Sequence, residues 1–192
     1  MTDNEILLDL LTDFTGTLQW VIQDLPLVAL YWQPDAEANT IGVTVWHIGR
    51  SFDVLKTRIL QNLPHTAEIW HTGGWSTQTG YNPHGIGFAG WGTLARFTRA
   101  EVAAIPELTA AELLNYVEQS AAALQSYLAT MPTEKLYQPP AGWLAPAESA
   151  YQPVTAYHAI RAILMDTREH LGEIKALKAM WERRNIKIRT CH

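Results

Sequence analysis

The sequence predicts an all-α fold, a four-helix bundle with long irregular connections. Four long segments repeat apolar residues at steps of three and four, which is the spacing along one face of a helix. Residues that favour helix N-termini precede these segments, and prolines interrupt the chain between them. No segment shows the alternating pattern of a strand, so we expect helices that bury one face against each other.

The first two helices follow from their apolar stripes and their ends. Residues 4–24 form the first helix, and Pro26 ends it. Thr40 is a suitable N-cap for the second helix, which continues to about residue 62. His47 lies one turn after Val43 in this helix, so we expect its side chain to face inward.

Residues 64–95 form an excursion between the second and third helices. The segment mixes seven glycines with aromatic residues that include Trp75, Tyr81 and Trp91. Glycine permits unusual backbone angles, and aromatic side chains supply contact area. Long connections in compact domains often serve as lids or binding loops, so we expect a structured excursion that packs on the bundle.

Two capping boxes mark the next helices. Thr98 and Glu101 have the Thr-x-x-Glu spacing and start a short helix that Pro106 ends. Thr109 and Glu112 have the same spacing and start the long third helix, which runs to about residue 130. Both helices therefore begin at positions that local chemistry defines.

The last third of the chain holds the fourth helix. Residues 133–153 contain four prolines and form an irregular crossover. Thr155 then opens the fourth helix, which continues to about Arg183. The basic run near the C-terminus suits solvent, so we assign residues 1–185 to a single domain and residues 186–192 to a C-terminal tail.

Composition argues against several classes of function. The formal net charge of −5 at pH 7 disfavours nucleic acid as a partner, because phosphate binding needs a basic face. Cys191 is the single cysteine, so the chain cannot form an internal disulfide, which favours a reducing compartment. The N-terminus lacks the layout of a signal peptide, and no apolar run is long enough for a membrane span. We expect a cytoplasmic protein.

The candidate site begins with two residues of the fourth helix. Asp166 and His170 are four positions apart, so they share one face of that helix. A carboxylate on a core-facing position is costly unless it is paired or bound to a metal. Two such side chains can hold one metal ion, with a third ligand from a facing helix, and His47 is the candidate for this third position.

Another interpretation needs no metal. Asp166 can pair with Arg58 or Arg161, while His170 is a hydrogen-bonded core histidine. Because Asp-x3-His occurs often by chance, spacing alone favours this interpretation. A lone histidine such as His47 is also more often a core or surface residue than a ligand.

Two short segments carry a resemblance to a known family. Residues 40–53 and residues 166–174 resemble the second and fourth helices of the DinB/YfiT superfamily of helical-bundle metalloproteins. The resemblance implies a four-helix bundle, often dimeric, with one divalent metal held by a histidine of the second helix and two residues of the fourth. His47 and His170 match two of these ligands.

The sequence departs from the family pattern at two positions. Asp166 stands where the family more often has histidine, and a carboxylate is a competent ligand for zinc or iron(II). Glu173 replaces the usual glutamine. We expect Glu173 either to orient His170 from behind or to lie in solvent beside Lys175 and Lys178.

Further residues are candidates for lining the pocket or for contacting and orienting the metal ligands. Trp46, Tyr81 and Trp91 can wall a pocket, although ordinary core packing explains them equally well. Arg50 lies about one turn from His47 and can meet an anionic substrate, with a surface salt bridge as the simpler alternative. His84 can contribute if the excursion folds over the metal, and its alternative is an exposed loop position.

The resemblance leads to a functional hypothesis with stated alternatives. We expect an enzyme that uses one divalent metal, zinc, iron or nickel, on a small molecule. The most concrete activity is that of a thiol-dependent S-transferase with a low-molecular-weight thiol as cosubstrate. Metal-assisted hydrolysis at the same site is one alternative. The other is a non-catalytic, stress-related module that binds a ligand or dimerises. By the same resemblance we expect a homodimer.

Overall fold

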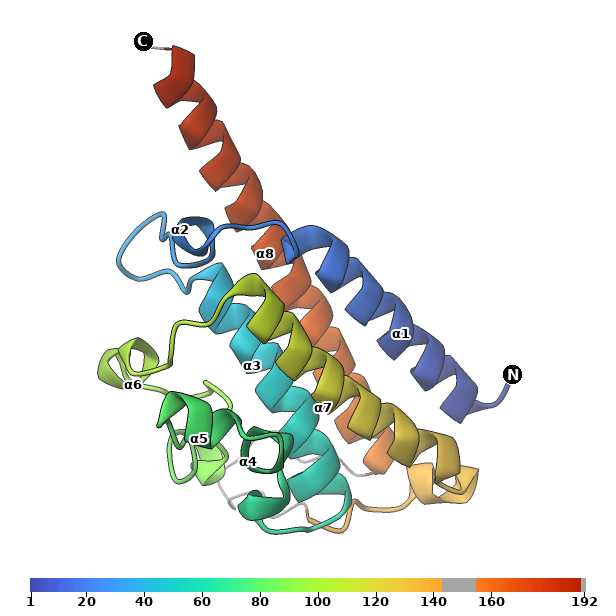
Figure 1. Ribbon diagram of the computed structural model, residues 1–192. Helices are drawn as coiled ribbons and strands as arrows, with labels where there is room; N and C mark the ends of the chain where they lie inside the picture. The colour runs from blue at the N-terminus through green and yellow to red at the C-terminus, as the bar shows by residue number, and fades with distance from the viewer. Residues whose placement is uncertain (143–154, 191–192) are drawn as a thin grey trace.

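The computed structural model describes residues 1–142 and 155–190, and every regular element in this part of the chain is helical. Four long helices form a bundle, namely α1 (Asp3–Ile22), α3 (Ile41–Val54), α7 (Ala110–Thr130) and α8 (Ala156–Thr190). Helix α3 packs most extensively on α7 and also contacts α8, while α1 packs against α7 and α8 (Figure 1). The predicted all-α fold is confirmed.

Local capping chemistry starts the helices where the sequence predicts. The hydroxyl of Thr40 accepts a hydrogen bond from the backbone N–H of Val43 and begins α3. Both predicted capping boxes are present, at Thr98 before α6 (Arg99–Ala103) and at Thr109 before α7. The first long helix ends at Ile22, shortly before Pro26, which is the N-cap residue of the single turn of α2 (Leu27–Leu30).

The second long helix changes its geometry near its end. After α3 the chain continues as a π-helical turn, Leu55–Leu60, so helical structure ends close to the predicted residue 62. Gly142 packs directly against this turn, and its N–H donates to the carbonyl of Ile59 at 2.9 Å. A Cβ atom at Gly142 would lie 1.7 Å from the carbonyl oxygen of Arg58, so only glycine allows this approach.

Helix α3 is the central element of the core, because all of its residues are buried. Gly49 lets the ring of Tyr116 on α7 lie close to the α3 backbone, since a Cβ there would be 2.6 Å from that ring. The largest core side chains come from all four long helices and from the excursion. They include Leu11, Phe14, Leu18, Ile41, Trp46, Ile48, Phe52, Trp70, Tyr116, Leu124 and Ile160.

The excursion is structured, as predicted, and lies against α3 and α7 (Figure 1). Its helical pieces are the 3-10 turns His65–Ala67 and Phe88–Gly90 and the short helices α4 (Ile69–Thr72) and α5 (Trp75–Thr79). Trp70 is fully buried among aromatic rings, with ring centroids 6.0 Å from Trp46, 6.4 Å from Tyr81 and 5.0 Å from Tyr116. These contacts anchor its first half by apolar burial.

A buried ionic network anchors the same excursion by hydrogen bonds. The guanidinium of Arg50 donates to Glu68 at 2.9 Å and to the carbonyls of Trp91 and Gly92 at 2.9 and 3.1 Å. It also lies 3.5 Å from Asp53. All three charged side chains of the network are desolvated, because Arg50, Asp53 and Glu68 are each at most 1% exposed.

Asp53 completes the network from the other side. Its carboxylate accepts hydrogen bonds from the backbone N–H groups of Ile69 and Trp70 at 2.7 and 2.8 Å. It also accepts one from the hydroxyl of Tyr116 at 3.2 Å. Two N–H groups at the start of α4 therefore find their acceptor on α3, which fixes α4 to the bundle.

The fourth helix is longer than predicted. Helix α8 continues to Thr190, whereas the sequence pattern indicates an end near Arg183. The backbone of residues 186–190 extends this helix past its predicted end, so part of the segment assigned to the C-terminal tail is helical. Of the predicted crossover, residues 133–137 form a 3-10 turn, and residues 143–154 lie outside the described residues, as do Cys191 and His192. Within the described residues, no helix has the length and apolar character needed to cross a membrane.

We predict that Arg50→Met destabilises the fold strongly. The substitution leaves Asp53 and Glu68 buried without their cation, which typically costs about 3–5 kcal/mol of unfolding free energy. Urea unfolding of wild type and variant measures this loss. Arg168→Met is a matched control, because Arg168 makes an exposed ion pair with Asp13, and such pairs contribute about 0–1 kcal/mol. Equal losses in the two variants would contradict the prediction.

Candidate metal centre

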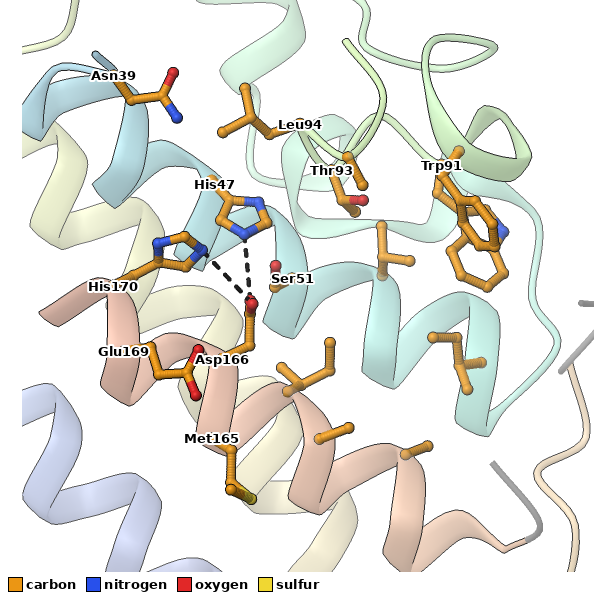
Figure 2. Close-up of a pocket in the computed structure, with 17 residues that line it drawn as sticks. Asn39, His47, Ser51, Trp91, Thr93, Leu94, Met165, Asp166, Glu169 and His170 are labelled. Carbon is orange, nitrogen blue, oxygen red and sulfur yellow. Dashed lines mark hydrogen bonds and ion pairs between the residues drawn. The ribbon is translucent and has the colours of Figure 1, made fainter. Parts of the chain in front are cut away.

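Three side chains from two facing helices converge on one point. His47 projects from the middle of α3, and Asp166 and His170 project from consecutive turns of α8 (Figure 2). The three potential ligand atoms all lie within 4.8 Å of one another. The structure therefore brings His47 beside the face of α8 that carries Asp166 and His170.

The distances suit an ion better than direct hydrogen bonds. His47 Nε2 lies 3.4 Å from Asp166 Oδ2, and His170 Nε2 lies 3.6 Å from Asp166 Oδ1. Both distances exceed the usual N–H···O range. Tetrahedral zinc with bonds near 2.1 Å places its ligand atoms about 3.4 Å apart. The two imidazole-to-carboxylate distances are close to this value, whereas the three ligand atoms as a set lie within 4.8 Å of one another, so a bound divalent cation would draw them closer together.

A second carboxylate orients one of the imidazoles. Glu173 Oε2 lies 2.7 Å from His170 Nδ1, which makes Nδ1 the donor and leaves the Nε2 lone pair directed at the site. Glu173 thus has the first of its two predicted placements. The Nδ1 atom of His47 is buried and makes no hydrogen bond, so the two imidazoles differ in their support.

The carboxyl of Asp166 is held in its charged form. Burial raises its pKa, but the polar contact with His47 and the charges of His47 and His170 outweigh burial, so the net effect is a lowered pKa. Arg58, one of the alternative partners considered for Asp166, lies against Glu68 instead, at 3.5 Å. Two imidazoles and one ionised carboxylate form a suitable ligand set for zinc, iron(II) or nickel.

The three residues form part of the wall of a cavity of about 730 Å³. This volume lies in the range of small-molecule sites in proteins. Helices α3 and α8 supply one side, and the end of the excursion supplies the other (Figure 2). Besides the three candidate ligands, the lining consists of Asn39, Ser51, Val54, Ile59, Phe88, Trp91, Thr93, Leu94, Ala95, Ala159, Ala162, Ile163, Met165 and Glu169.

Comparison with known proteins gives the family. A model of the DinB superfamily matches residues 10–174, which is most of the chain. The chain belongs to the DinB superfamily. The match spans all three candidate ligands, and the resemblance of residues 40–53 and 166–174 to this superfamily is confirmed.

A solved structure shares the fold of this DinB-superfamily protein. It is described as a conserved protein of a locus from Enterococcus faecalis. The two chains superpose with a TM-score of 0.69 at 16% sequence identity, covering 93% of this chain and 96% of the other. No curated protein matches the sequence. The cytoplasmic location, the homodimer and the thiol partner therefore stay predictions.

In this DinB-superfamily protein, two of the three aromatic residues predicted to wall the pocket do not line the cavity. Trp91 lines the cavity, as predicted. Trp46 and Tyr81 instead contact each other in the aromatic cluster around Trp70, where their ring centroids are 6.0 Å apart. They support the excursion and do not form the cavity wall, because the excursion folds its first half onto α3 and α7.

The prediction for Arg50 is corrected by its burial. With no exposed surface, the guanidinium makes neither a substrate contact nor a surface salt bridge. Its donors are directed at Glu68 and at the carbonyls of Trp91 and Gly92. Arg50 therefore acts on the cavity indirectly, since it holds the backbone that carries Trp91.

Four polar lining residues, Asn39, Ser51, Thr93 and Glu169, were not identified from the sequence, and two of them lie on the helices that carry the candidate ligands. Ser51 lies one turn after His47 on α3, and Glu169 lies one turn after Asp166 on α8. Both positions follow from helical spacing once the ligands are known. Serine and glutamate on helices are usually solvated, so nothing in the sequence singles them out beforehand.

His84 lies in a separate histidine cluster and does not line the cavity. Its ring stacks on His65 with centroids 3.7 Å apart, and His71 meets His65 edge-on at 5.3 Å. Burial lowers the pKa of both His71 and His84, and the nearby charge of His65 lowers them further. The guanidinium groups of Arg50 and Arg58 act in the same direction, and Asp53 and Glu68 oppose them. Of the two placements considered for His84, the structure shows the exposed loop position and not one at the cavity.

We predict that this histidine cluster makes the fold sensitive to acid. The unfolded chain binds protons on His71 and His84 near the ordinary pKa of 6.5, whereas the folded chain binds them only at lower pH. The folded state therefore loses stability as the pH falls below about 6.5. Melting temperatures recorded between pH 7.5 and 5.5 should fall less for His84→Gln than for wild type.

His158→Gln is the control for this experiment, because His158 is exposed on α8 and contacts Thr155, away from the cluster. It should retain the acid sensitivity of wild type. Identical pH profiles for His84→Gln and wild type would show that the cluster does not contribute.

Proposed function

We propose that this protein is a metal-dependent enzyme that acts on a small molecule, with the metal held by His47, Asp166 and His170. The observation that supports this most directly is the convergence of the three side chains on the wall of a cavity. Three protein ligands leave coordination positions open on the cavity side, as in catalytic rather than structural sites. The exposed fraction of the Asp166 side chain, 44%, indicates that this side is accessible.

Each residue of the site has a distinct task. His47 and His170 provide neutral nitrogen donors, and Glu173 fixes the orientation of His170. Asp166 supplies one negative charge. A divalent metal bound by these groups would lower the pKa of a bound thiol or water. Glu169 places a second carboxylate at the cavity, where it can accept the proton that the nucleophile releases.

The reaction that we favour is transfer of a thiol to a small electrophile. The sulfur lone pair forms a bond to an electrophilic carbon, the bond from that carbon to its leaving group breaks, and the leaving group departs with the electron pair. The S–H proton passes to Glu169 and then to solvent. The mainly apolar lining of the cavity supports this reaction over hydrolysis, because it limits the water available as a competing nucleophile.

Metal content is the first test of this proposal. Protein made without a histidine tag and reconstituted anaerobically with zinc, iron(II) or nickel should hold about one metal ion per chain by mass spectrometry. His47→Ala and Asp166→Ala each remove one of three ligands and should lose most of it. His158→Ala removes an exposed histidine of the same helix and should retain it. Absence of metal from reconstituted wild type would reject the proposal.

Activity is the second test. Metal-loaded protein is mixed with 1-chloro-2,4-dinitrobenzene and a low-molecular-weight thiol, and thioether and chloride are both measured. Glu169→Gln should reduce kcat by about 10²-fold or more, because the amide cannot accept the proton. Chloride release without thioether would indicate metal-assisted hydrolysis. Bound metal without turnover of any electrophile would favour the binding module.

A further inference from the structure

We infer that the cavity takes a ligand in two parts, a small head that binds the metal and an uncharged apolar tail about 10 Å long. This inference rests on the proposed function, because the head needs the metal centre. The described lining residues separate by chemistry along the cavity, and this separation defines both parts of the ligand.

The candidate ligands lie at one end of the cavity, with Leu94 and Met165 beside them, and most of the other apolar lining residues lie toward the opposite end (Figure 2). Along α3 and the π-helical turn, His47 and Ser51 come first, and Val54 and Ile59 follow. Helix α8 runs antiparallel to α3 along the cavity (Figure 2). Its apolar lining residues Ala159, Ala162 and Ile163 therefore come before the polar group that starts at Asp166. The seven steps of helical rise from Ala159 to Asp166 span about 10 Å, which sets the length of the tail.

Small side chains leave room for this tail. Ala159 and Ala162 lie one turn apart on the α8 face of the cavity, where larger residues would fill the space. The opposite wall is aromatic: Phe88 and Trp91 meet edge-on with centroids 5.6 Å apart. An apolar chain or ring between these walls would displace water and contact carbon atoms of the protein on both sides.

The charge of the lining requires the tail to be neutral. Among the described residues that line the cavity, none is a lysine or an arginine. The buried Arg50 donates to Glu68 and to two carbonyls, and Arg96 lies over the Phe88 ring at 5.3 Å without lining the cavity itself. Two carboxylates, Asp166 and Glu169, already lie at the polar end. A carboxylate or phosphate on the tail would therefore lose its hydration without gaining a cation.

The test uses zinc-loaded protein and a series of straight-chain hydroxamic acids, whose head chelates zinc and whose tail varies. Isothermal titration calorimetry should show affinity rising about fourfold per added methylene until the chain reaches about 10 Å. In the hydroxamic acid of the series that has a six-carbon tail, a carboxylate at the far end of the tail should weaken binding at least tenfold. A flat response to chain length, or no penalty for the carboxylate, would overturn the inference.

Substitution of Ala162 locates the tail. Ala162→Phe fills the apolar end and should abolish the chain-length response while leaving acetohydroxamate binding unchanged. Ala176→Phe is the matched control, because Ala176 is exposed on the same helix, and it should behave as wild type. If Ala162→Phe unfolds, as its melting temperature would show, Ala162→Leu repeats the test with a smaller side chain. An unchanged chain-length response in a folded variant would overturn the assignment.

Binding experiments on the metal-free protein distinguish failure of the metal centre from failure of the apolar subsite. 1-Octanol should bind the apolar end without metal and should not bind Ala162→Phe. If octanol binds in this way but acetohydroxamate does not bind zinc-loaded protein, the metal centre fails and the apolar subsite stands. If acetohydroxamate binds but neither octanol nor longer hydroxamates gain from the apolar end, the metal centre stands and the two-part ligand is rejected.

Discussion

The desolvated charges of Arg50, Asp53 and Glu68 are the constraint on which the rest of the structure depends. A buried guanidinium must satisfy its donors within the protein, and here the acceptors are Glu68 and the carbonyls of Trp91 and Gly92. Each of these acceptors belongs to the excursion. Pairing the Arg50 charge therefore fixes the excursion to α3 at two separate places, Glu68 and the Trp91–Gly92 backbone. The second of these places positions Trp91 in the cavity wall.

Unlike the Arg50 network, the candidate metal centre does not rely on the excursion for its geometry. Its ligands lie on two long helices whose backbones are fixed by core packing, so their separation does not depend on a loop. The excursion contributes no candidate ligand and supplies only the wall that faces them. Asp166 gives the site one more negative charge than a third imidazole would, which lowers the net positive charge of a bound divalent cation. The candidate ligands therefore belong to the bundle, and the facing wall of the cavity belongs to the excursion.

Local chemistry explains how much of this protein could be predicted. Apolar stripes and caps such as Thr40 and Thr109 act within a few residues, so they placed the long helices. The spacing of Asp166 and His170 is also local, whereas the link to His47 needed the resemblance to the DinB superfamily. Arg50 was misplaced because a charge on a helix is normally exposed, and its partners are distant in sequence. The extension of α8 was missed because the basic composition of residues 183–189 suggested solvent, and composition alone does not end a helix.

The π-helical turn Leu55–Leu60 lies directly after the last straight portion of α3. A turn of this kind holds one residue more than an α-helical turn, so it is equivalent to a single-residue insertion. Deleting one residue there would restore α-helical winding and rotate the following side chains by about 100° around the axis. His47 lies two turns upstream and would stay in register. Among relatives, gain or loss of one codon at this point would reshape the far end of the cavity and leave the candidate ligands in place.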